Sequence, residues 1–167
     1  MPVAVTEESI VKANTQFWEQ MLSMRLEPVV LGGNAPVDAE MTMEVRCIGL
    51  PHVVGSCSLS GVWTGRIEVR LSQGLALEAT AAMLMQPVET VQAHDTLDAT
   101  REIANMIAGT LKSALPRPCA MTVPTATVEA DDFCVLPLTA DSVTVFFRHE
   151  AGEFMVRVSE AAPGAAI

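Results

Sequence analysis

The hydrophobic residues of this chain recur at two different spacings, which separate helical segments from strand-like ones. After Thr6, apolar residues keep a helical period up to Pro28, so we expect a helix that Thr6 caps at its N-terminus. A second helix is predicted over 73–86, where Ser72 supplies the cap and Pro87 ends it. Both predicted helices thus begin after a hydroxyl residue and end near a proline.

Alternating apolar and polar residues predict strands in much of the remaining chain. The strand-like stretches are 39–50, 52–72 and 119–160. A hairpin turn is expected at 60–61 or at 64–65, and a second turn at 150–153. The longest helix is predicted from about Asp95 to Ala114, just before two prolines. The order helix, strands, two helices, strands predicts an α+β fold, an antiparallel sheet with long helices packed on one face.

Length and composition fit one folded domain. The chain has 167 residues, of which 50% are hydrophobic and 18% charged, enough to bury one sizeable core. We expect a single domain over 1–160 and a frayed tail over 161–167. The N-terminus lacks the features of a signal peptide, and the most apolar run, 75–85, is short and interrupted by Glu78. We therefore expect no membrane span, and we expect the protein to be cytoplasmic.

The charge of the chain limits the partners that suit it. Twenty acidic residues against ten basic ones give a formal net charge of −10. Such a surface would repel phosphate backbones and anionic lipid. Nucleic acid and membranes are therefore not expected as partners, whereas a protein with a basic rim would be suitable.

The cysteines and histidines form no recognisable metal-binding or catalytic pattern. They are Cys47, Cys57, Cys119 and Cys134, and His52, His94 and His149. The cysteines form no CxxC pair, have no histidine at zinc-site spacing and lie in apolar surroundings, so we expect buried thiols in a reducing compartment. The histidines are scattered, and we expect them at the surface or in loops.

Three polar residues interrupt the apolar pattern of the longest predicted helix. Asp98, Glu102 and Asn105 follow the spacing i, i+4, i+7 and therefore stack on one face, with Glu102 and Asn105 as i, i+3 neighbours. Lys112 lies farther along the same helix. Because the rest of the helix is mostly apolar, the polar stripe is narrow.

This stripe has two interpretations. In the first, Asp98 is a first-turn acid, Glu102 pairs with a nearby arginine and Asn105 is an ordinary surface amide. Against it, asparagine is a poor helix former, and Gly109 costs about 1 kcal/mol relative to alanine in a helix interior. Ala104 and Gly109 are small enough to let another backbone approach closely. In the second interpretation, the stripe reaches another molecule.

The segment EIANMIAGTLK resembles the signature helix of the CheC/CheX chemotaxis phosphatases, in which an acidic residue and a Glu-x-x-Asn motif precede an apolar step and a glycine. The matching residues are Asp98, Glu102, Asn105, Gly109 and Lys112. The resemblance runs from about residue 7 to 160 and includes Pro124 on the following strand. It is closer to CheX than to CheC, because the first predicted helix has Val11 and Asn14 where CheC repeats Glu-x-x-Asn. One site is therefore expected.

The resemblance implies a function in two-component signalling. The substrate would be the phosphoryl-aspartate of a CheY-like response-regulator receiver domain. Asn105 would hold the attacking water in line with the P–O bond, and Glu102 would pair with a lysine of the receiver. Asp98 and Lys112 would contact the partner. No cofactor of its own is implied, because the receiver brings its own Mg²⁺.

Two other functions stay open. A non-catalytic binding module of the same fold would recognise a receiver or another signalling protein without hydrolysis, although the intact Glu-x-x-Asn pair favours catalysis. A structural subunit would be supported if Glu102 and Asn105 were buried. The resemblance also implies a homodimer joined through its sheets, for which 141–149 and 153–160 would offer edges.

Overall fold

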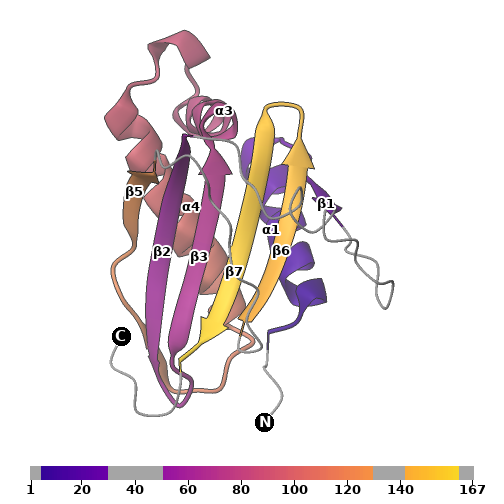
Figure 1. The fold of residues 1–167 in the computed structure, drawn as a ribbon, viewed down its shortest axis with the longest axis vertical. Coiled ribbons are helices and arrows are strands. Elements are labelled where there is room, and N and C mark those ends of the chain that lie inside the picture. The colour runs from indigo at the N-terminus through magenta and orange to yellow at the C-terminus, as the bar shows by residue number, and fades with distance from the viewer. Residues whose placement is uncertain (1–4, 30–50, 130–141, 162–167) are drawn as a thin grey trace.

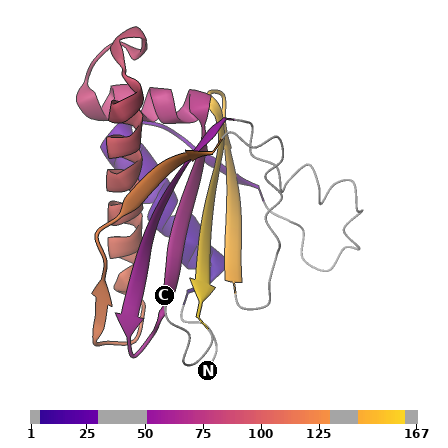
Figure 2. The ribbon, with the colours of Figure 1, turned by 60° about the vertical axis from the view of Figure 1, so that its left-hand side comes forward.

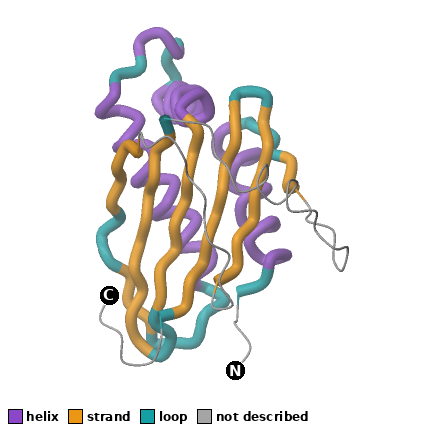
Figure 3. The backbone as a smooth tube through the Cα atoms, viewed as in Figure 1, coloured by secondary structure: helices purple, strands orange, loops and turns teal. Residues whose placement is uncertain are grey.

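The structure, a computed structural model, describes residues 5–29, 51–129 and 142–161. Its helices are α1 (Glu7–Leu22), α3 (Gln73–Leu84), the 3-10 helix η1 (Val88–Thr90) and α4 (Ala93–Lys112). Its strands are β1 (Glu27–Val29), β2 (His52–Gly61), β3 (Gly65–Ser72), β4 (Cys119–Met121), β5 (Thr125–Glu129), β6 (Ser142–His149) and β7 (Gly152–Glu160). Figure 3 shows how these helices and strands follow one another along the backbone.

The strands form one antiparallel sheet, and the helices cover one of its faces. The strand order is β1-β6-β7-β3-β2-β4, and β5 also pairs with β2. α1 and α4 lie behind the sheet in Figure 1, and the turned view in Figure 2 shows the helices together on one side. The predicted α+β fold is therefore confirmed.

Both predicted hairpins are present. β2 and β3 are joined over 62–64, which follows the first alternative turn position and overlaps the second at Thr64, and β6 and β7 are joined over 150–151. Other parts of the prediction, namely the strand at 39–50, the portion 130–141 of the last strand stretch and the tail beyond residue 161, lie outside the described residues.

Of the two segments expected to offer edges for dimerisation, the one at 153–160 lies inside this sheet, whereas β1 covers the one at 141–149 over only part of its length. β7 pairs with β3 on one side and with β6 on the other, and β1 covers β6 at Phe146–Arg148. Backbone groups that are already paired within a sheet cannot accept another strand. In the described part of the chain, the sheet ends at β1 on one side and at β4 and β5 on the other.

The N-terminus of α1 is capped as the sequence predicts, whereas the predicted cap of α3 is not formed. Thr6 caps α1 as predicted, since its Oγ1 accepts a hydrogen bond from the Ser9 N–H at 3.2 Å, while Ser9 Oγ accepts one from the Thr6 N–H at 2.9 Å. Ser72 stands at the cap position of α3, but its Oγ accepts from the Glu153 N–H at 3.0 Å instead. α3 ends before Met85, which is left-handed with φ 51°, and so does not reach the proline.

The first helix is shorter than predicted. α1 ends at Leu22, whereas the apolar period continues to Pro28. Ser23 takes a left-handed conformation with φ 54°, and the Met24 N–H donates to the Trp18 carbonyl oxygen at 2.9 Å. This closing turn ends the helix, and the chain continues into β1, so the helical prediction beyond residue 22 is wrong.

The core lies between the helices and the sheet, and aromatic rings join the two layers. Trp18 of α1 packs edge-on against Phe154 of β7, with ring centroids 5.0 Å apart. Phe154 also contacts Phe147 of β6, with centroids 5.6 Å apart. All three rings are almost completely buried. These contacts anchor α1 to the middle of the sheet.

α4 approaches the sheet closely at Gly55 of β2. A Cβ atom built at Gly55 would lie 2.9 Å from the Thr100 carbonyl oxygen and 3.1 Å from the Ala104 Cβ. Ala104 is fully buried, so the expectation that it permits a close approach is confirmed. Because this side of α4 is seated on the sheet, its opposite side is directed away from the core.

Candidate functional site

A capped start and a buried face hold α4 in place. The Gln92 N–H donates to Asp95 Oδ2 at 2.8 Å. The helix therefore begins at Ala93 rather than Asp95, and it ends at Lys112 rather than Ala114. Its buried residues are Thr96, Ala99, Thr100, Ile103, Ala104, Ile107, Ala108 and Leu111.

The outer face of α4 carries the predicted polar stripe. Asp98 and Glu102 are exposed, and Asn105 is half-buried. The side chains of Glu102 and Asn105 make no hydrogen bond or ion pair with any residue that the structure describes. Their carboxylate and carboxamide groups are therefore free to contact another molecule. The burial that would have supported a structural subunit is not observed.

Asp98 is placed differently from the other two residues of the stripe. Its carboxylate pairs with Arg101, its i+3 neighbour on α4. Asp98 is also not a first-turn acid, because that position belongs to Asp95. The arginine pairing expected for Glu102 in the first interpretation is thus made by Asp98 instead, and Glu102 has no arginine partner among the described residues.

Gly109 faces open space rather than another element of the chain. A Cβ atom built there would have no atom within 4 Å, so the predicted close approach of another backbone is not made within the described chain. Gly109 instead borders a groove of about 710 Å³ at the end of α4. The described residues that line it are Gly109, Lys112, Ser113, Arg117, Pro118 and Cys119. The predicted partner-contact residue Lys112 therefore lies at this groove.

The asparagine of the first helix, Asn14, is part of the packed interior rather than of an outward-facing site. Asn14 is completely buried, and its Nδ2 donates to the Ile10 carbonyl oxygen at 2.8 Å. A buried carboxamide that is bonded to its own helix cannot reach a partner. α1 therefore presents no counterpart of Asn105 at this position.

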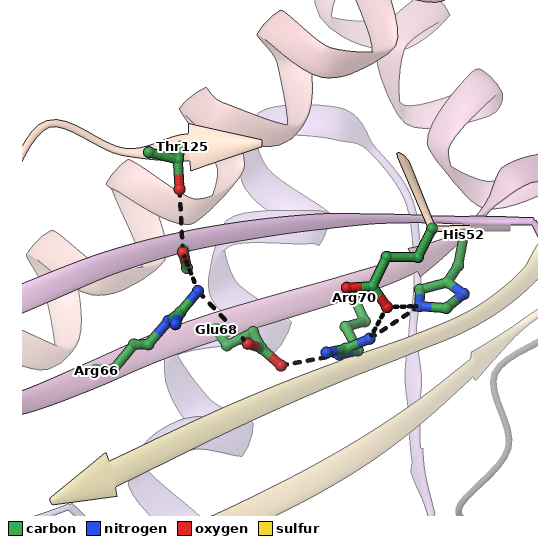
Figure 4. Close-up of polar contacts among 7 residues, drawn as sticks. His52, Arg66, Glu68, Arg70 and Thr125 are labelled. Carbon is green, nitrogen blue, oxygen red and sulfur yellow. Dashed lines mark hydrogen bonds and ion pairs between the residues drawn. The ribbon is translucent and has the colours of Figure 1, made fainter. Parts of the chain in front are cut away.

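A charged network that sequence reasoning missed lies on the face of the sheet away from the helices (Figure 4). Alternate residues of β3 point to opposite faces, so Arg66, Glu68 and Arg70 lie opposite the core side chains. Arg70 donates from Nε to Glu68 Oε1 at 2.8 Å and from Nη1 to Glu129 Oε2 at 2.7 Å. His52 Nε2 lies 3.1 Å from the same Glu129 oxygen.

The network links three strands. His52 belongs to β2, Arg70 to β3 and Glu129 to β5. The alternation of charge along β3 is visible in the sequence, but the pairing with His52 and Glu129 depends on strand register. His52 is completely buried, so the expectation of a surface or loop position is wrong for this histidine. His94 is exposed, and His149 Nδ1 accepts the Ala151 N–H in the last turn.

The network shifts the protonation of two of its members. Burial lowers the pKa of His52 from its usual 6.5, and the charge of Arg70 lowers it further, while Glu129 opposes the shift. Burial by itself raises the pKa of Glu129, but the hydrogen bond and charge of Arg70, together with His52, bring it below its usual 4.5. At neutral pH, His52 is therefore uncharged and Glu129 carries its negative charge. His52 Nδ1 is buried without a hydrogen-bond partner among the described residues.

The cysteines only partly match the expectation of buried thiols. Cys57 is buried, and burial raises the pKa of its thiol. Cys119 is half-buried beside the groove, where its Sγ contacts the Trp63 carbonyl oxygen at 3.5 Å. Cys47 and Cys134 lie outside the described residues. Within the described ranges, no three His, Cys, Asp or Glu side chains are placed to hold a metal ion, and no helix is long and apolar enough to cross a membrane.

An antiparallel sheet covered on one face by helices, one of which presents a Glu-x-x-Asn pair outward, is the arrangement of a CheC/CheX-like domain. The sequence model of the family described as "Chemotaxis phosphatase CheX" matches residues 53–148, more than half of the chain. The chain therefore belongs to the CheX family. No curated protein matches it significantly in sequence.

Solved structures agree with this family fold. The chemotaxis protein CheX from Vibrio vulnificus is 17% identical with a TM-score of 0.68, covering 96% of this chain and 100% of its own. CheX from Desulfovibrio desulfuricans is 20% identical with a TM-score of 0.67, covering 92% and 97%. The CheX–CheY–BeF3–Mg²⁺ complex from Borrelia burgdorferi matches at 15% identity with a TM-score of 0.65, covering 93% and 97%. At these identities the likeness concerns the fold.

Proposed function

We propose that the protein is a phosphatase of two-component signalling, which acts in the cytoplasm on the phosphoryl-aspartate of a CheY-like receiver domain. The observation that carries the proposal is the Glu102–Asn105 pair on the outer face of α4, which has no partner among the described residues. Membership of the CheX family supports it, as does the complex of the Borrelia burgdorferi CheX with CheY.

The proposed chemistry needs only positioning by this chain. The Asn105 carboxamide can donate and accept hydrogen bonds at once, so it can hold a water molecule in line with the bond to be broken. Glu102 lies one turn earlier on the same face and would pair with a lysine of the receiver. The chain supplies no nucleophile, and the Mg²⁺ that neutralises the phosphoryl oxygens belongs to the receiver.

Asp98 and Lys112 would extend the contact to both ends of the stripe. Lys112 lies two turns after Asn105, and its ammonium group has no ion-pair partner among the described residues. Asp98 already pairs with Arg101, so it would contact the receiver as part of that pair. We also propose that the protein forms a homodimer through an edge of its sheet.

The phosphatase proposal is tested by replacing Asn105. Candidate receivers are labelled with radioactive phosphate, and the loss of label is followed with wild-type protein and with Asn105→Ala. We expect the variant to be at least ~10-fold slower, which corresponds to ~1.4 kcal/mol of barrier, because the attacking water is no longer held. Gln20→Ala, which removes an exposed carboxamide from α1, is the matched control and should keep the wild-type rate.

Two results would count against hydrolysis by this site. Equal rates for wild type and Asn105→Ala would show that Asn105 positions no water. Binding of a receiver with no acceleration of dephosphorylation would instead favour the non-catalytic binding module of the same fold.

A further inference from the structure

The groove at the end of α4 is continuous with the candidate site. Gly109 and Lys112 follow Asn105 by four and seven residues, so all three lie on the same face of the helix. Both residues line the groove, whose other described lining residues come from the segment that leads into β4. A partner that covers Asn105 would therefore extend over this groove.

The groove is positively charged in a strongly acidic protein. Lys112 and Arg117 are the charged residues among its described lining, and neither forms an ion pair with a described residue. Arg66, Arg70 and Arg101, in contrast, all pair with acidic side chains. A lysine in the last turn of a helix is favoured by the helix dipole, but this explanation does not apply to Arg117, which lies beyond the helix.

We propose that this groove binds an acidic segment of the receiver that lies beside the phosphorylated aspartate. This inference rests on the proposed function, because it takes the receiver as the partner. A chain with a net charge of −10 repels an acidic segment of its partner. Lys112 and Arg117, which have no ion-pair partner among the described residues, offset that repulsion at the groove, steer the encounter and help to orient the receiver.

Reversing the two charges tests the groove. Receivers are activated with beryllofluoride and Mg²⁺, and their affinity is measured for wild type and for the double variant Lys112→Glu/Arg117→Glu. We expect binding to weaken by at least ~10-fold at low salt. The difference should shrink to less than ~3-fold near 1 M salt, where the screening length is about 3 Å. With phosphorylated receiver, KM should rise while kcat changes by less than about twofold.

A second double variant separates the groove from net charge. Arg25→Glu/Arg148→Glu makes the same change in net charge at the β1 and β6 side of the sheet, away from α4. Both arginines are exposed and have no ion-pair partner among the described residues. We expect this control to weaken binding by less than ~3-fold. An equal loss in both double variants, or no loss in the groove variant, would overturn the proposal.

The two proposals fail in different ways. If wild type binds an activated receiver but does not accelerate dephosphorylation, the phosphatase proposal fails, and the groove is still judged by the effect of charge reversal on binding. If wild type hydrolyses and the groove variant binds and hydrolyses equally well, the groove proposal alone fails. If wild type binds no activated receiver, the groove proposal is also wrong.

Discussion

At the scale of single residues, substitutions of Gly109 can distinguish effects on stability from effects on partner binding. Its position in α4 is exposed, and a Cβ atom there would meet no atom of the described chain within 4 Å. Glycine is about 1 kcal/mol worse than alanine in a helix interior. We therefore expect Gly109→Ala to raise the free energy of unfolding by roughly 0.5–1 kcal/mol, measured by urea denaturation.

The same position tests whether the outer face of α4 is covered by a partner. Gly109→Trp should leave the fold intact, because the position is exposed and its Cβ would meet no described atom within 4 Å, yet lower the affinity for an activated receiver by at least ~10-fold. Gln20→Trp places the same ring on the exposed surface of α1 and serves as the control. Unchanged receiver affinity in Gly109→Trp would mean that this face is not an interface.

The residues of the stripe show what helical spacing can and cannot predict. The positions of Glu102 and Asn105 on one outward face follow from the period of the helix, because the apolar residues fix which face is buried. The spacing could not decide whether an arginine pairs with Asp98 or with Glu102. Arg101 is adjacent to Glu102 in sequence but pairs with Asp98, its neighbour one turn earlier.

At the scale of elements, the charged network on the outer face of the sheet attaches β5 to β2 and β3. β5 has only five residues and pairs with β2 alone in the described chain, so side-chain contacts add to a short backbone ladder. Arg70 and His52 both contact the Glu129 carboxylate at the end of β5. β5 also lies beside α4, so its attachment helps to hold the side of the sheet on which the candidate site rests.

This network makes the stability of the protein depend on pH. The pKa of His52 is lowered by burial from 6.5, so below pH 6.5 the unfolded chain takes up a proton that the folded protein resists. The pKa of Glu129 lies below its usual 4.5 in the folded state, because Arg70 and His52 outweigh its burial. Both contributions are present at neutral pH. We expect the free energy of unfolding to fall from about pH 6.5 downward, with a second decrease below pH 4.5.

Urea denaturation between about pH 8 and about pH 3 measures this dependence. His52→Gln should remove the decrease that begins near pH 6.5, and Glu129→Gln the one below pH 4.5. His94→Gln, which changes a histidine that is 76% exposed, should keep the wild-type profile. A decrease near pH 6.5 that persists in His52→Gln would assign it to another group.

The elements could largely be predicted, whereas the contacts between distant elements could not. Local signals such as the Thr6 cap and the apolar period of α4 act within a few residues, so they can be read from the sequence. The end of α1 could not be predicted in this way. Leu22 and Leu26 have helical spacing, although the helix ends between them. His52 and Glu129 are far apart in sequence, and only the register of β2 and β5 brings them together.

At the scale of the whole molecule, the order of strands decides where a second copy can join. The sequence predicts an antiparallel sheet but not its strand order. The resemblance placed the dimer edges at β6 and β7, but β7 is paired on both sides, and β1 pairs with β6 at Phe146–Arg148. The β4 and β5 side is an edge in the described chain and carries exposed apolar side chains, with Val123 84% and Val128 54% exposed. An edge strand with exposed apolar residues is a favourable surface for strand pairing.

The proposed homodimer should therefore join at the β4 and β5 edge. Light scattering at micromolar concentration should give twice the chain mass of 17.8 kDa, and Val128→Glu should shift it towards the monomer, because a charge at the joined edge would be buried. Met85→Glu is the control, because it introduces the same charge at an apolar residue that directly follows α3 and is 92% exposed. This variant should leave the dimer intact. A mass of one chain for the wild type would contradict the dimer, and dissociation by both variants would remove the assignment to this edge.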